Sequence, residues 1–250
     1  MHDPSSPQRN VLLASLPAAD LRLLEPHLSH VPLRTGQRLF EPDEVIDGVI
    51  FPLSGMVSIM TVMNDGTEVE TAAIGCEGAV GLVQGLGSRH VFWRALVQME
   101  GQGLRIDAAR FQQLARDSEA IRVMAGRYTE ALLMQVLQLV ACNALHPVEA
   151  RFCRWLLMCR DRAASDVLPL TQEFLAEMLG VNRTTITQVA KGLQKAGVIE
   201  YRRGTIRLID RPGLENTACE CHALISHRFR TLLPARSVPE KVAKEVSSRR

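Results

Sequence analysis

The sequence of 250 residues predicts an α+β fold in three successive parts: a β-rich region, one long helix and a smaller helical domain with a β-hairpin. Three observations support this prediction. Short apolar runs alternate with glycine, proline and Asn-Asp between residues 31 and 107, residues 118–145 contain no proline and one glycine, and residues 171–208 carry two short helical patterns followed by a hairpin pattern. With 46% hydrophobic and 22% charged residues, the composition is that of a globular protein and excludes disorder over most of the chain.

The two ends of the chain are polar and carry no helical or strand period. Residues 1–10 lack the apolar core of a secretory signal, and no run approaches 18 consecutive apolar residues. We therefore expect a cytoplasmic protein without membrane contact, whose thiols stay reduced. We also expect disordered tails at residues 1–11 and 234–250, the second of them basic.

Residues 12–116 are predicted to form a small barrel or a double-stranded β-helix (jelly roll), which begins with a short helix within residues 15–30. Asn64-Asp65-Gly66 between two apolar runs is typical of a β-hairpin turn. The connections are too short for helices to alternate with the strands. The runs that indicate strands are residues 49–51, 57–62, 69–72 and 91–97.

Residues 117–145 are predicted to form a single helix whose second half is apolar on nearly every face. A small β-domain can cover one face of such a helix, so the other face needs a partner, most simply a second copy of the chain. The alternative is a core helix of a monomer. The side chains expected to supply the dimer surface are Leu132, Leu133, Val136, Leu137, Leu139 and Val140.

The formal charge changes sign near residue 146. Residues 1–145 hold 11 Lys and Arg against 16 Asp and Glu, whereas residues 146–211 hold 11 against 7. An acidic first part and a basic second part indicate two domains, and nucleic acid is the partner that a basic domain favours.

The pattern of residues 171–196 is typical of a helix-turn-helix. Thr171 can cap a first helix, Gly180 permits a left-handed turn, and Asn182 can cap a second helix of about residues 183–195. Two short strands around Arg203-Gly204 then predict a wing, so residues 146–211 are expected to form a winged helix-turn-helix. A single C-terminal helix is expected over residues 212–233.

The outward face of the second helix carries short or forked polar side chains that can reach base edges and phosphates. We therefore predict a double-stranded DNA contact, against the alternative of a helical hairpin that binds no DNA. No phosphate-binding glycine loop, H-E-x-x-H or G-x-S-x-G motif is present, and we expect no enzymatic activity. The predicted DNA contacts are Thr171, Asn182, Arg183, Thr184, Thr185, Thr187, Gln188, Lys191, Arg202 and Arg203.

With these features the chain resembles the cyclic-AMP receptor and fumarate–nitrate regulator (CRP/FNR) family of bacterial transcription regulators over about residues 12–211. The resemblance is strongest in Leu170-Thr171, Leu175-Ala176 and Gly180-Val181-Asn182-Arg183-Thr184-Thr185-Ile186. It implies a cyclic-nucleotide-binding-like sensor domain and a homodimer that binds a palindromic operator in response to an unknown effector. It also implies RNA polymerase as a partner if the protein is an activator.

The same resemblance identifies candidate effector residues and two departures from the family. Val80 stands where cyclic-AMP-binding members carry the Glu of Gly-Glu, and it cannot hold a ribose hydroxyl as that Glu does, although Glu77 is near. Gly78 in the same segment is a further candidate. Arg89-His90 stands for the Arg-Ser that holds the phosphate, without the hydroxyl. The cofactor is therefore unknown, and cyclic-nucleotide binding is not the favoured interpretation. No cysteine precedes Cys76, so no iron–sulfur cluster is expected.

The six cysteines form no pair of C-x-x-C motifs, and we expect no metal site. Cys219-Glu220-Cys221-His222 has the form of a metal clip but stands alone in the sequence. A metal- or redox-responsive regulator that uses these Cys and His residues is the alternative function.

Overall fold

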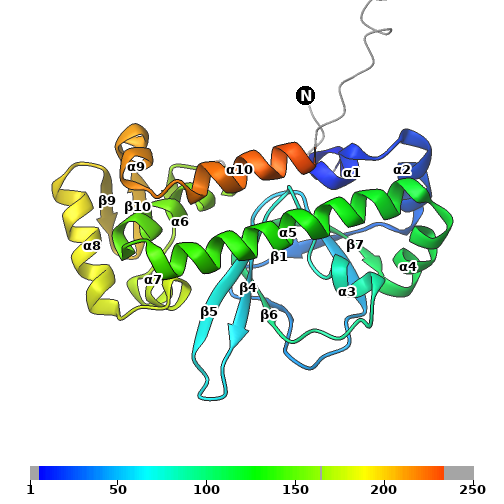
Figure 1. The fold of residues 1–250 in the computed structure, drawn as a ribbon, viewed down its shortest axis with the longest axis horizontal. Coiled ribbons are helices and arrows are strands. Elements are labelled where there is room, and N and C mark those ends of the chain that lie inside the picture. Colours follow the sequence, from blue (N-terminus) through cyan, green and yellow to red (C-terminus); the bar gives the residue numbers. More distant parts are fainter. Residues whose placement is uncertain (1–5, 164, 234–250) are drawn as a thin grey trace, which may run out of the picture.

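The computed structural model describes residues 6–163 and 165–233, and the expected order of β-roll, long helix and C-terminal domain is confirmed (Figure 1). Residues 1–5 and 234–250, where we expected tails, lie outside the described residues. The tail prediction is wrong for residues 6–11, because Pro7–Arg9 forms a 3-10 helix and Asn10 is fully buried. The Asn10 amide nitrogen donates hydrogen bonds to the carbonyl oxygens of Pro52 and Gly78, which anchors this segment on the β-roll.

The first helices cover one end of the β-roll. Asn10 caps α1 (Val11–Ser15), since its side-chain oxygen accepts hydrogen bonds from the backbone of Leu12 and Leu13. Helix α2 (Ala18–Leu24) follows and continues into a 3-10 turn, Glu25–His27, within the range predicted for a short helix.

The β-roll consists of two antiparallel sheets, one with the order β1-β7-β3 and the other with the order β2-β6-β4-β5. The predicted hairpin is confirmed: β4 pairs with β5 up to Val62 opposite Glu68, and Gly66 takes a positive φ of 84° in the turn. The expectation that no helix separates strands is wrong, because α3 (Leu82–Leu86) lies between β5 and β6. The strands are β1 (Ser29–Leu33), β2 (Arg38–Phe40), β3 (Gly48–Pro52), β4 (Met56–Val62), β5 (Glu68–Ile74), β6 (Arg94–Met99) and β7 (Gly101–Asp107).

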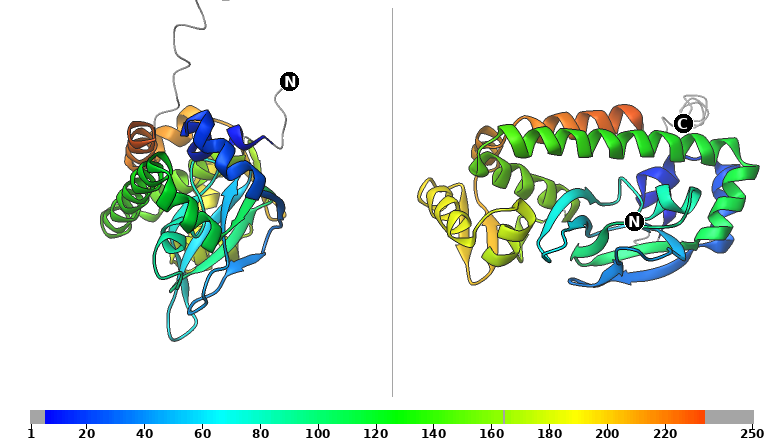
Figure 2. Two further views of the ribbon diagram at one scale, coloured as in Figure 1. Left: turned by 90° about the vertical axis from the view of Figure 1, so that its right-hand side faces the viewer. Right: turned by 60° about the horizontal axis from the view of Figure 1, so that its bottom comes forward.

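Helix α4 (Ala108–Asp117) leads into α5 (Glu119–Leu145), which Ser118 caps by accepting a hydrogen bond from the backbone of Ile121. Helix α5 runs along the length of the β-roll, lies over it and ends at the C-terminal domain (Figure 1; Figure 2, right). Two polar contacts fix its inner face: the Tyr128 hydroxyl donates to the Ala79 carbonyl at 2.9 Å, and the Gln135 amide donates to the Ala73 carbonyl at 3.0 Å.

The C-terminal domain is a helix-turn-helix beside a three-stranded sheet of order β8-β10-β9. The prediction of one C-terminal helix over residues 212–233 is wrong. The backbone of Ala218 is extended and ends α9, and α10 then runs back along α5 (Figure 1). The elements are α6 (Val148–Ala163), β8 (Val167–Leu168), α7 (Gln172–Leu179), α8 (Arg183–Lys195), β9 (Ile199–Arg202), β10 (Thr205–Leu208), α9 (Arg211–Thr217) and α10 (Cys221–Leu232).

The two domains share part of their hydrophobic core. Met56 and Met60 of the β-roll belong to the same buried cluster as Phe152 and Trp155 of α6. Burial of such side chains contributes roughly 1.5–3 kcal/mol each, so the domains are packed against each other rather than tethered. Within the described residues no helix combines the length and the hydropathy that crossing a membrane requires.

Candidate nucleic-acid interface

The turn between α7 and α8 has the geometry that the sequence predicts. The Thr171 hydroxyl accepts a hydrogen bond from the backbone of Phe174, and Gly180 ends α7 with a φ of 62°. Asn182 stands at the N-cap of α8, and its carbonyl oxygen accepts from Thr185 at 3.0 Å. The expected side-chain cap is not formed: no described residue of α8 bonds the Asn182 side chain, which is exposed and free to contact a ligand.

Helix α8 buries one face and exposes the other. Ile186, Ala190 and Leu193 are at most 2% exposed and hold the helix on the domain core. The opposite face presents exposed polar side chains to solvent, as a helix that enters the major groove must. The exposed predicted contacts on α8 are Arg183, Thr184, Gln188 and Lys191.

Two of the predicted contacts, Thr187 and Arg183, are engaged within the protein. The Thr187 hydroxyl is half-buried and donates to the Gln172 side chain at 2.7 Å, which ties α8 to α7. Thr185 is also half-buried. The guanidinium of Arg183 is exposed but lies 2.6 Å from the Glu173 carboxylate, so a DNA phosphate has to compete with Glu173 for it.

The wing is a tight hairpin between β9 and β10. Arg202 pairs with Thr205, and the two residues between them, Arg203 and Gly204, have positive φ values of 49° and 76°. Such a two-residue turn favours glycine, which Gly204 provides. Arg202 and Arg203 are both exposed, and Arg203 lines the same surface hollow as Thr171 and Arg183.

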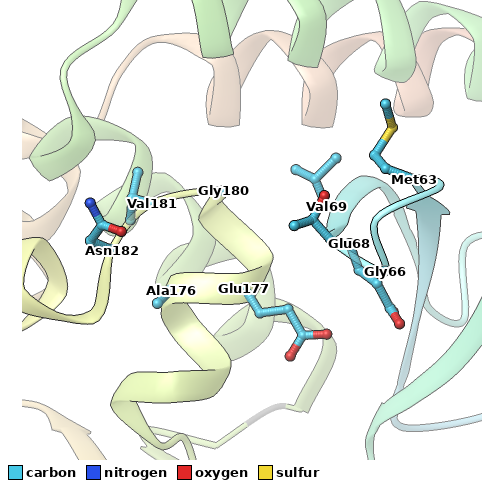
Figure 3. Close-up of a pocket in the computed structure, with 10 residues that line it drawn as sticks. Met63, Gly66, Glu68, Val69, Ala176, Glu177, Gly180, Val181 and Asn182 are labelled. Atoms are coloured by element: carbon cyan, nitrogen blue, oxygen red, sulfur yellow. The ribbon is translucent and has the colours of Figure 1, made fainter.

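The turn of the helix-turn-helix lies against the β4–β5 hairpin of the β-roll (Figure 3). Met63, Gly66 and Val69 from the hairpin face Glu177, Gly180 and Val181 across an open groove. A methyl group added at Gly180 would meet Val69 at 3.4 Å, which is an ordinary van der Waals distance, so the turn approaches the hairpin closely there.

A separate cavity of about 170 Å³ lies between the β-roll and α5. Trp93, Thr71, Leu132 and Val136 are among the residues that line it, and of its described lining residues none is charged. The Thr71 hydroxyl already donates to the Ile59 carbonyl at 3.1 Å. The cavity therefore suits a small apolar group better than a phosphate.

The four predicted effector residues do not line this cavity. Val80 is fully buried and exchanges two backbone hydrogen bonds with Ile50. Gly78 gives Tyr128 room to approach, since a methyl group there would lie 2.8 Å from its ring and hydroxyl. Arg89 is half-buried with a positive φ of 62°, and His90 is exposed. The packing of the β-roll decides where these four residues lie, and the sequence pattern alone does not reveal that packing.

The six residues predicted to form the dimer surface lie on different faces of α5. Leu133, Leu137 and Val140 are 56%, 54% and 64% exposed. Leu139 is 3% exposed and packs inside the chain, so its assignment to a dimer surface is wrong, while Leu132 and Val136 line the cavity instead. Seven of the exposed positions of α5 recur at alternating steps of three and four, which is the spacing of a coiled-coil seam. They are Val123, Gly126, Glu130, Leu133, Leu137, Val140 and Ala144.

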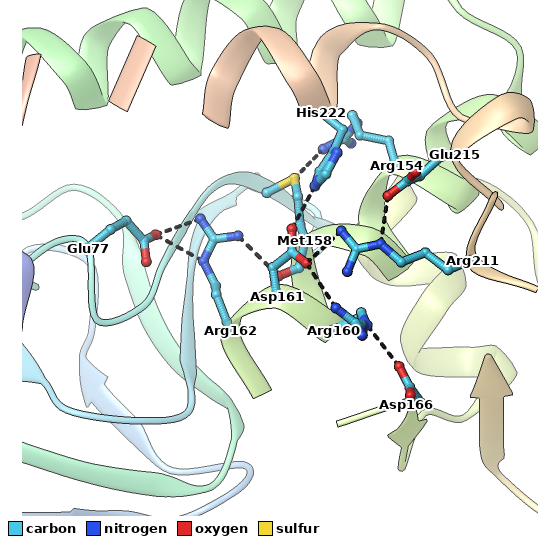
Figure 4. A network of polar contacts seen from close by, with 10 residues as sticks. All are labelled: Glu77, Arg154, Met158, Arg160, Asp161, Arg162, Asp166, Arg211, Glu215 and His222. Carbon is cyan, nitrogen blue, oxygen red and sulfur yellow. Dashed lines mark hydrogen bonds and ion pairs between the residues drawn. The ribbon is translucent and has the colours of Figure 1, made fainter. Parts of the chain in front are cut away.

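A polar network fastens α6 to its surroundings (Figure 4). Arg162 pairs with Glu77 of the β-roll at 2.6 Å and also donates to the Ala73 carbonyl. On the outer side of the helix Asp161 pairs with His222 at 2.9 Å. His222 is thus an ion-pair partner of α6, not a companion of the neighbouring cysteines.

Buried Glu70 makes a second contact between the domains. The Trp155 indole of α6 donates to one of its carboxyl oxygens at 2.9 Å, and the Ser58 hydroxyl contacts the other. Burial raises the pKa of Glu70, against the smaller opposing effects of Ser58 and Arg154.

The sequence pattern singled out Cys219 and Cys221 but grouped them with His222 and missed Cys142 and His146. Cys142 and His146, four residues apart at the end of α5, meet Cys219 and Cys221 near the start of α10. The i, i+4 spacing of Cys142 and His146 on one helix was the available signal.

Comparison with known proteins follows the same division of the chain. Sequence models of two families match: the cyclic nucleotide-binding domain over residues 30–118 and the Crp-like helix-turn-helix domain over residues 150–217. Together they cover more than half of the chain. A search of curated proteins found no match.

Solved structures with the same fold include three regulators. The c-di-GMP responsive global regulator CLP of Xanthomonas campestris is 21% identical, with 78% of this chain and 100% of that chain covered and a TM-score of 0.65. FixK2 of Bradyrhizobium japonicum is 16% identical, with 77% of this chain and 98% of that chain covered and a TM-score of 0.66. A CRP-family transcriptional regulator of Thermus thermophilus is 18% identical, with 75% of this chain and 96% of that chain covered and a TM-score of 0.65. At these identities the structures establish the fold. Taken with the two family models and the winged helix-turn-helix of the C-terminal domain, they show that the chain is a DNA-binding transcription regulator of the Crp/Fnr family.

Proposed function

We propose that the protein is a homodimer that binds a palindromic operator through α8 in the major groove and through the wing on the phosphate backbone. The observation that carries this proposal is the exposed polar face of α8 beside an arginine-tipped wing. Gln188 and Thr184 are the candidates to read base edges, whereas Arg202 and Arg203 supply charge for phosphates. We infer that this cytoplasmic regulator acts by binding rather than by catalysis, and that RNA polymerase is a partner if it activates transcription.

Dimerisation through the exposed seam of α5 supports the operator symmetry. Two-fold related recognition helices contact half-sites about one helical turn apart, roughly 34 Å. Leu133, Leu137 and Val140 give the seam its apolar character, and water-exposed apolar side chains at coiled-coil spacing are stabilised by a second copy.

The effector signal is proposed to reach the DNA-binding domain by two contacts. Leu132 and Val136 of α5 line the cavity, and they directly precede the seam residues Leu133 and Leu137 in the sequence. The β4–β5 hairpin meets the turn at Gly180. A ligand in the cavity would therefore act on the dimer helix, and a moved hairpin on the recognition helix.

The test of base reading is Gln188→Ala, with Arg203→Ala as the matched wing variant. Gln188→Ala is expected to relax preference at one base position and to cost about 1–3 kcal/mol on the selected duplex but little on a scrambled one. Arg203→Ala is expected to weaken both duplexes alike and to lower the salt slope by about one unit. Binding to both duplexes is measured at several salt concentrations. Equal losses on the two duplexes for Gln188→Ala would contradict base reading by α8.

Cyclic AMP is expected to bind poorly, because the cavity offers its phosphate and ribose no charged partner among the described lining residues. A buried polar group without a partner costs about 1–3 kcal/mol. The measurement is calorimetric titration of the full chain with cyclic AMP, with a small apolar ligand library as comparison. A dissociation constant in the micromolar range or below for cyclic AMP would contradict this interpretation of the cavity.

A further inference from the structure

Three thiols and one imidazole converge where α5 ends and α10 begins. Cys142 lies in the last turn of α5, and His146 is the residue that ends it. Cys219 and Cys221 lie on either side of Glu220, the N-cap of α10, and Cys221 is the first residue of that helix. Their ligand atoms all lie within 4.8 Å of one another. The Cys142 and Cys219 sulfurs are 3.5 Å apart, and the Cys221 sulfur is 3.5 Å from Nδ1 of His146.

Two of these separations match the edges of a metal-sized tetrahedron. Zinc bonds of about 2.3 Å to sulfur and about 2.0–2.1 Å to nitrogen place two sulfurs about 3.8 Å apart and a sulfur and a nitrogen about 3.5 Å apart. The Cys142–Cys219 and Cys221–His146 distances are within a few tenths of an ångström of these values, and no pair of ligand atoms is more than 4.8 Å apart. We propose that Cys142, His146, Cys219 and Cys221 bind one zinc-type divalent ion, a site that does not depend on the proposed operator or dimer.

The surroundings of His146 are those of a metal ligand. Its Nε2 lies 3.3 Å from the Glu220 carboxylate, which favours the proton on Nε2 and leaves the Nδ1 lone pair facing the cysteines. A carboxylate behind the distal nitrogen is the usual support of a metal-bound histidine. Gln138 also donates a hydrogen bond to the Cys221 sulfur at 3.2 Å, an interaction that a thiolate accepts better than a thiol.

Two buried arginines, Arg151 and Arg154, lie near the site. Three thiolates, a neutral imidazole and a divalent ion carry a net charge of −1, which needs cationic neighbours. Arg151 and Arg154 are 9% and 3% exposed, and neither forms an ion pair with a carboxylate in the part of the chain that the structure describes. The Nε of each has no hydrogen-bond partner among the described residues. An anionic metal centre nearby would balance these two buried charges.

Bound metal would join parts of the chain that are far apart in sequence. Cys142 and Cys219 are separated by 77 residues, and between them lies the whole winged helix-turn-helix. A four-coordinate ion would clamp α10 against the end of α5 and stabilise the folded state by its binding free energy. The break between α9 and α10, which places Cys219 and Cys221 on one turn, is part of this arrangement.

The experiment uses the full chain, purified with reductant, stripped with a chelator and titrated anaerobically with Co²⁺. We expect one Co²⁺ per chain, with sulfur-to-cobalt charge transfer and the visible bands of tetrahedral thiolate coordination, and displacement by Zn²⁺. Cys221→Ser should lose the spectrum or bind at least tenfold more weakly. The control Cys76→Ser, a half-buried cysteine outside the cluster, should match the wild type.

A second measurement separates a misfolded variant from a lost site. Glu220→Gln keeps all four ligands and is expected to weaken Co²⁺ binding by about 10- to 100-fold, because it removes only the support of His146. Zn²⁺ should raise the melting temperature of the wild type and of Cys76→Ser but not that of Cys221→Ser. If Cys221→Ser still binds Co²⁺ with the wild-type spectrum, even at less than one ion per chain, the proposal is overturned. A Cys142–Cys219 disulfide in protein kept under reductant would also overturn it, since it would consume two of the ligands.

Discussion

At the scale of single residues, Glu70 shows how burial decides protonation at the contact between the domains. It is 5% exposed and accepts a hydrogen bond from the Trp155 indole, and burial raises its pKa although Ser58, Arg154 and Arg162 act in the other direction. Below the ordinary value of 4.5 the side chain is protonated in both the folded and the unfolded chain. As the pH rises through the folded pKa, the buried carboxyl is ionised at a cost and its contribution to stability is lost.

Glu70→Gln is therefore expected to raise the melting temperature at neutral pH, with the difference from wild type vanishing below pH 4.5. The amide retains an oxygen for Trp155 and avoids the cost of a buried charge. Thermal unfolding from acid to neutral pH measures this, with the exposed Glu100→Gln as control. A less stable Glu70→Gln at neutral pH would mean that an ionised carboxylate pairs with Arg154.

At the scale of elements, α5 has two apolar faces with different tasks. Its inner face holds Tyr128, Gln135 and Leu139 against the β-roll. Its outer seam leaves Leu133 and Leu137 more than half exposed. An apolar helix of this kind is stabilised on both sides only in an assembly, and each leucine buried contributes roughly 1.5–3 kcal/mol.

Replacing Leu133 and Leu137 together by Glu should give monomers, because the charges would face each other across the seam. Light scattering at micromolar concentration measures the mass, and the variant should also bind the operator weakly. The matched control replaces the exposed Val45 and Phe92 of the β-roll by Glu and is expected to leave the mass unchanged. A monomeric wild type at that concentration would contradict the seam.

At the scale of the whole molecule, the pair of Arg162 and Glu77 joins the DNA-binding domain to the β-roll. Their side chains are 10% and 22% exposed, and Glu77 also accepts a hydrogen bond from the backbone of Gly75. Such a shielded charged contact is stronger than a surface pair because water screens it little. The relative position of the two domains therefore depends on it.

A double-mutant cycle with Arg162→Met and Glu77→Gln should give a coupling energy of about 1–3 kcal/mol in chemical unfolding. The same cycle on the exposed pair Arg207 and Glu200, 3.8 Å apart, should give about 0–1 kcal/mol. A coupling for Arg162 and Glu77 no larger than this control would show that the interface rests on its apolar contacts alone.

The features that the residue pattern predicts correctly are local. The cap at Thr171, the glycine turn at Gly180 and the hairpin at Arg203-Gly204 depend on hydrogen bonds and φ values within a few residues, so their pattern predicts them. The long helix follows from an uninterrupted apolar run. The predicted DNA contacts rest on the same local periodicity, and they stay predictions.

Which residues of distant segments meet depends on the packing of the whole chain. Leu139 is buried while Leu133 is exposed because the β-roll covers one side of α5, and no property of an all-apolar run distinguishes the two sides. Val80 lies in the core instead of the cavity because its backbone pairs with Ile50. Cys142 and His146 meet Cys219 and Cys221 because α10 folds back along α5. Long-range packing sets each of these contacts, and its free energy is not encoded in the spacing of neighbouring residues.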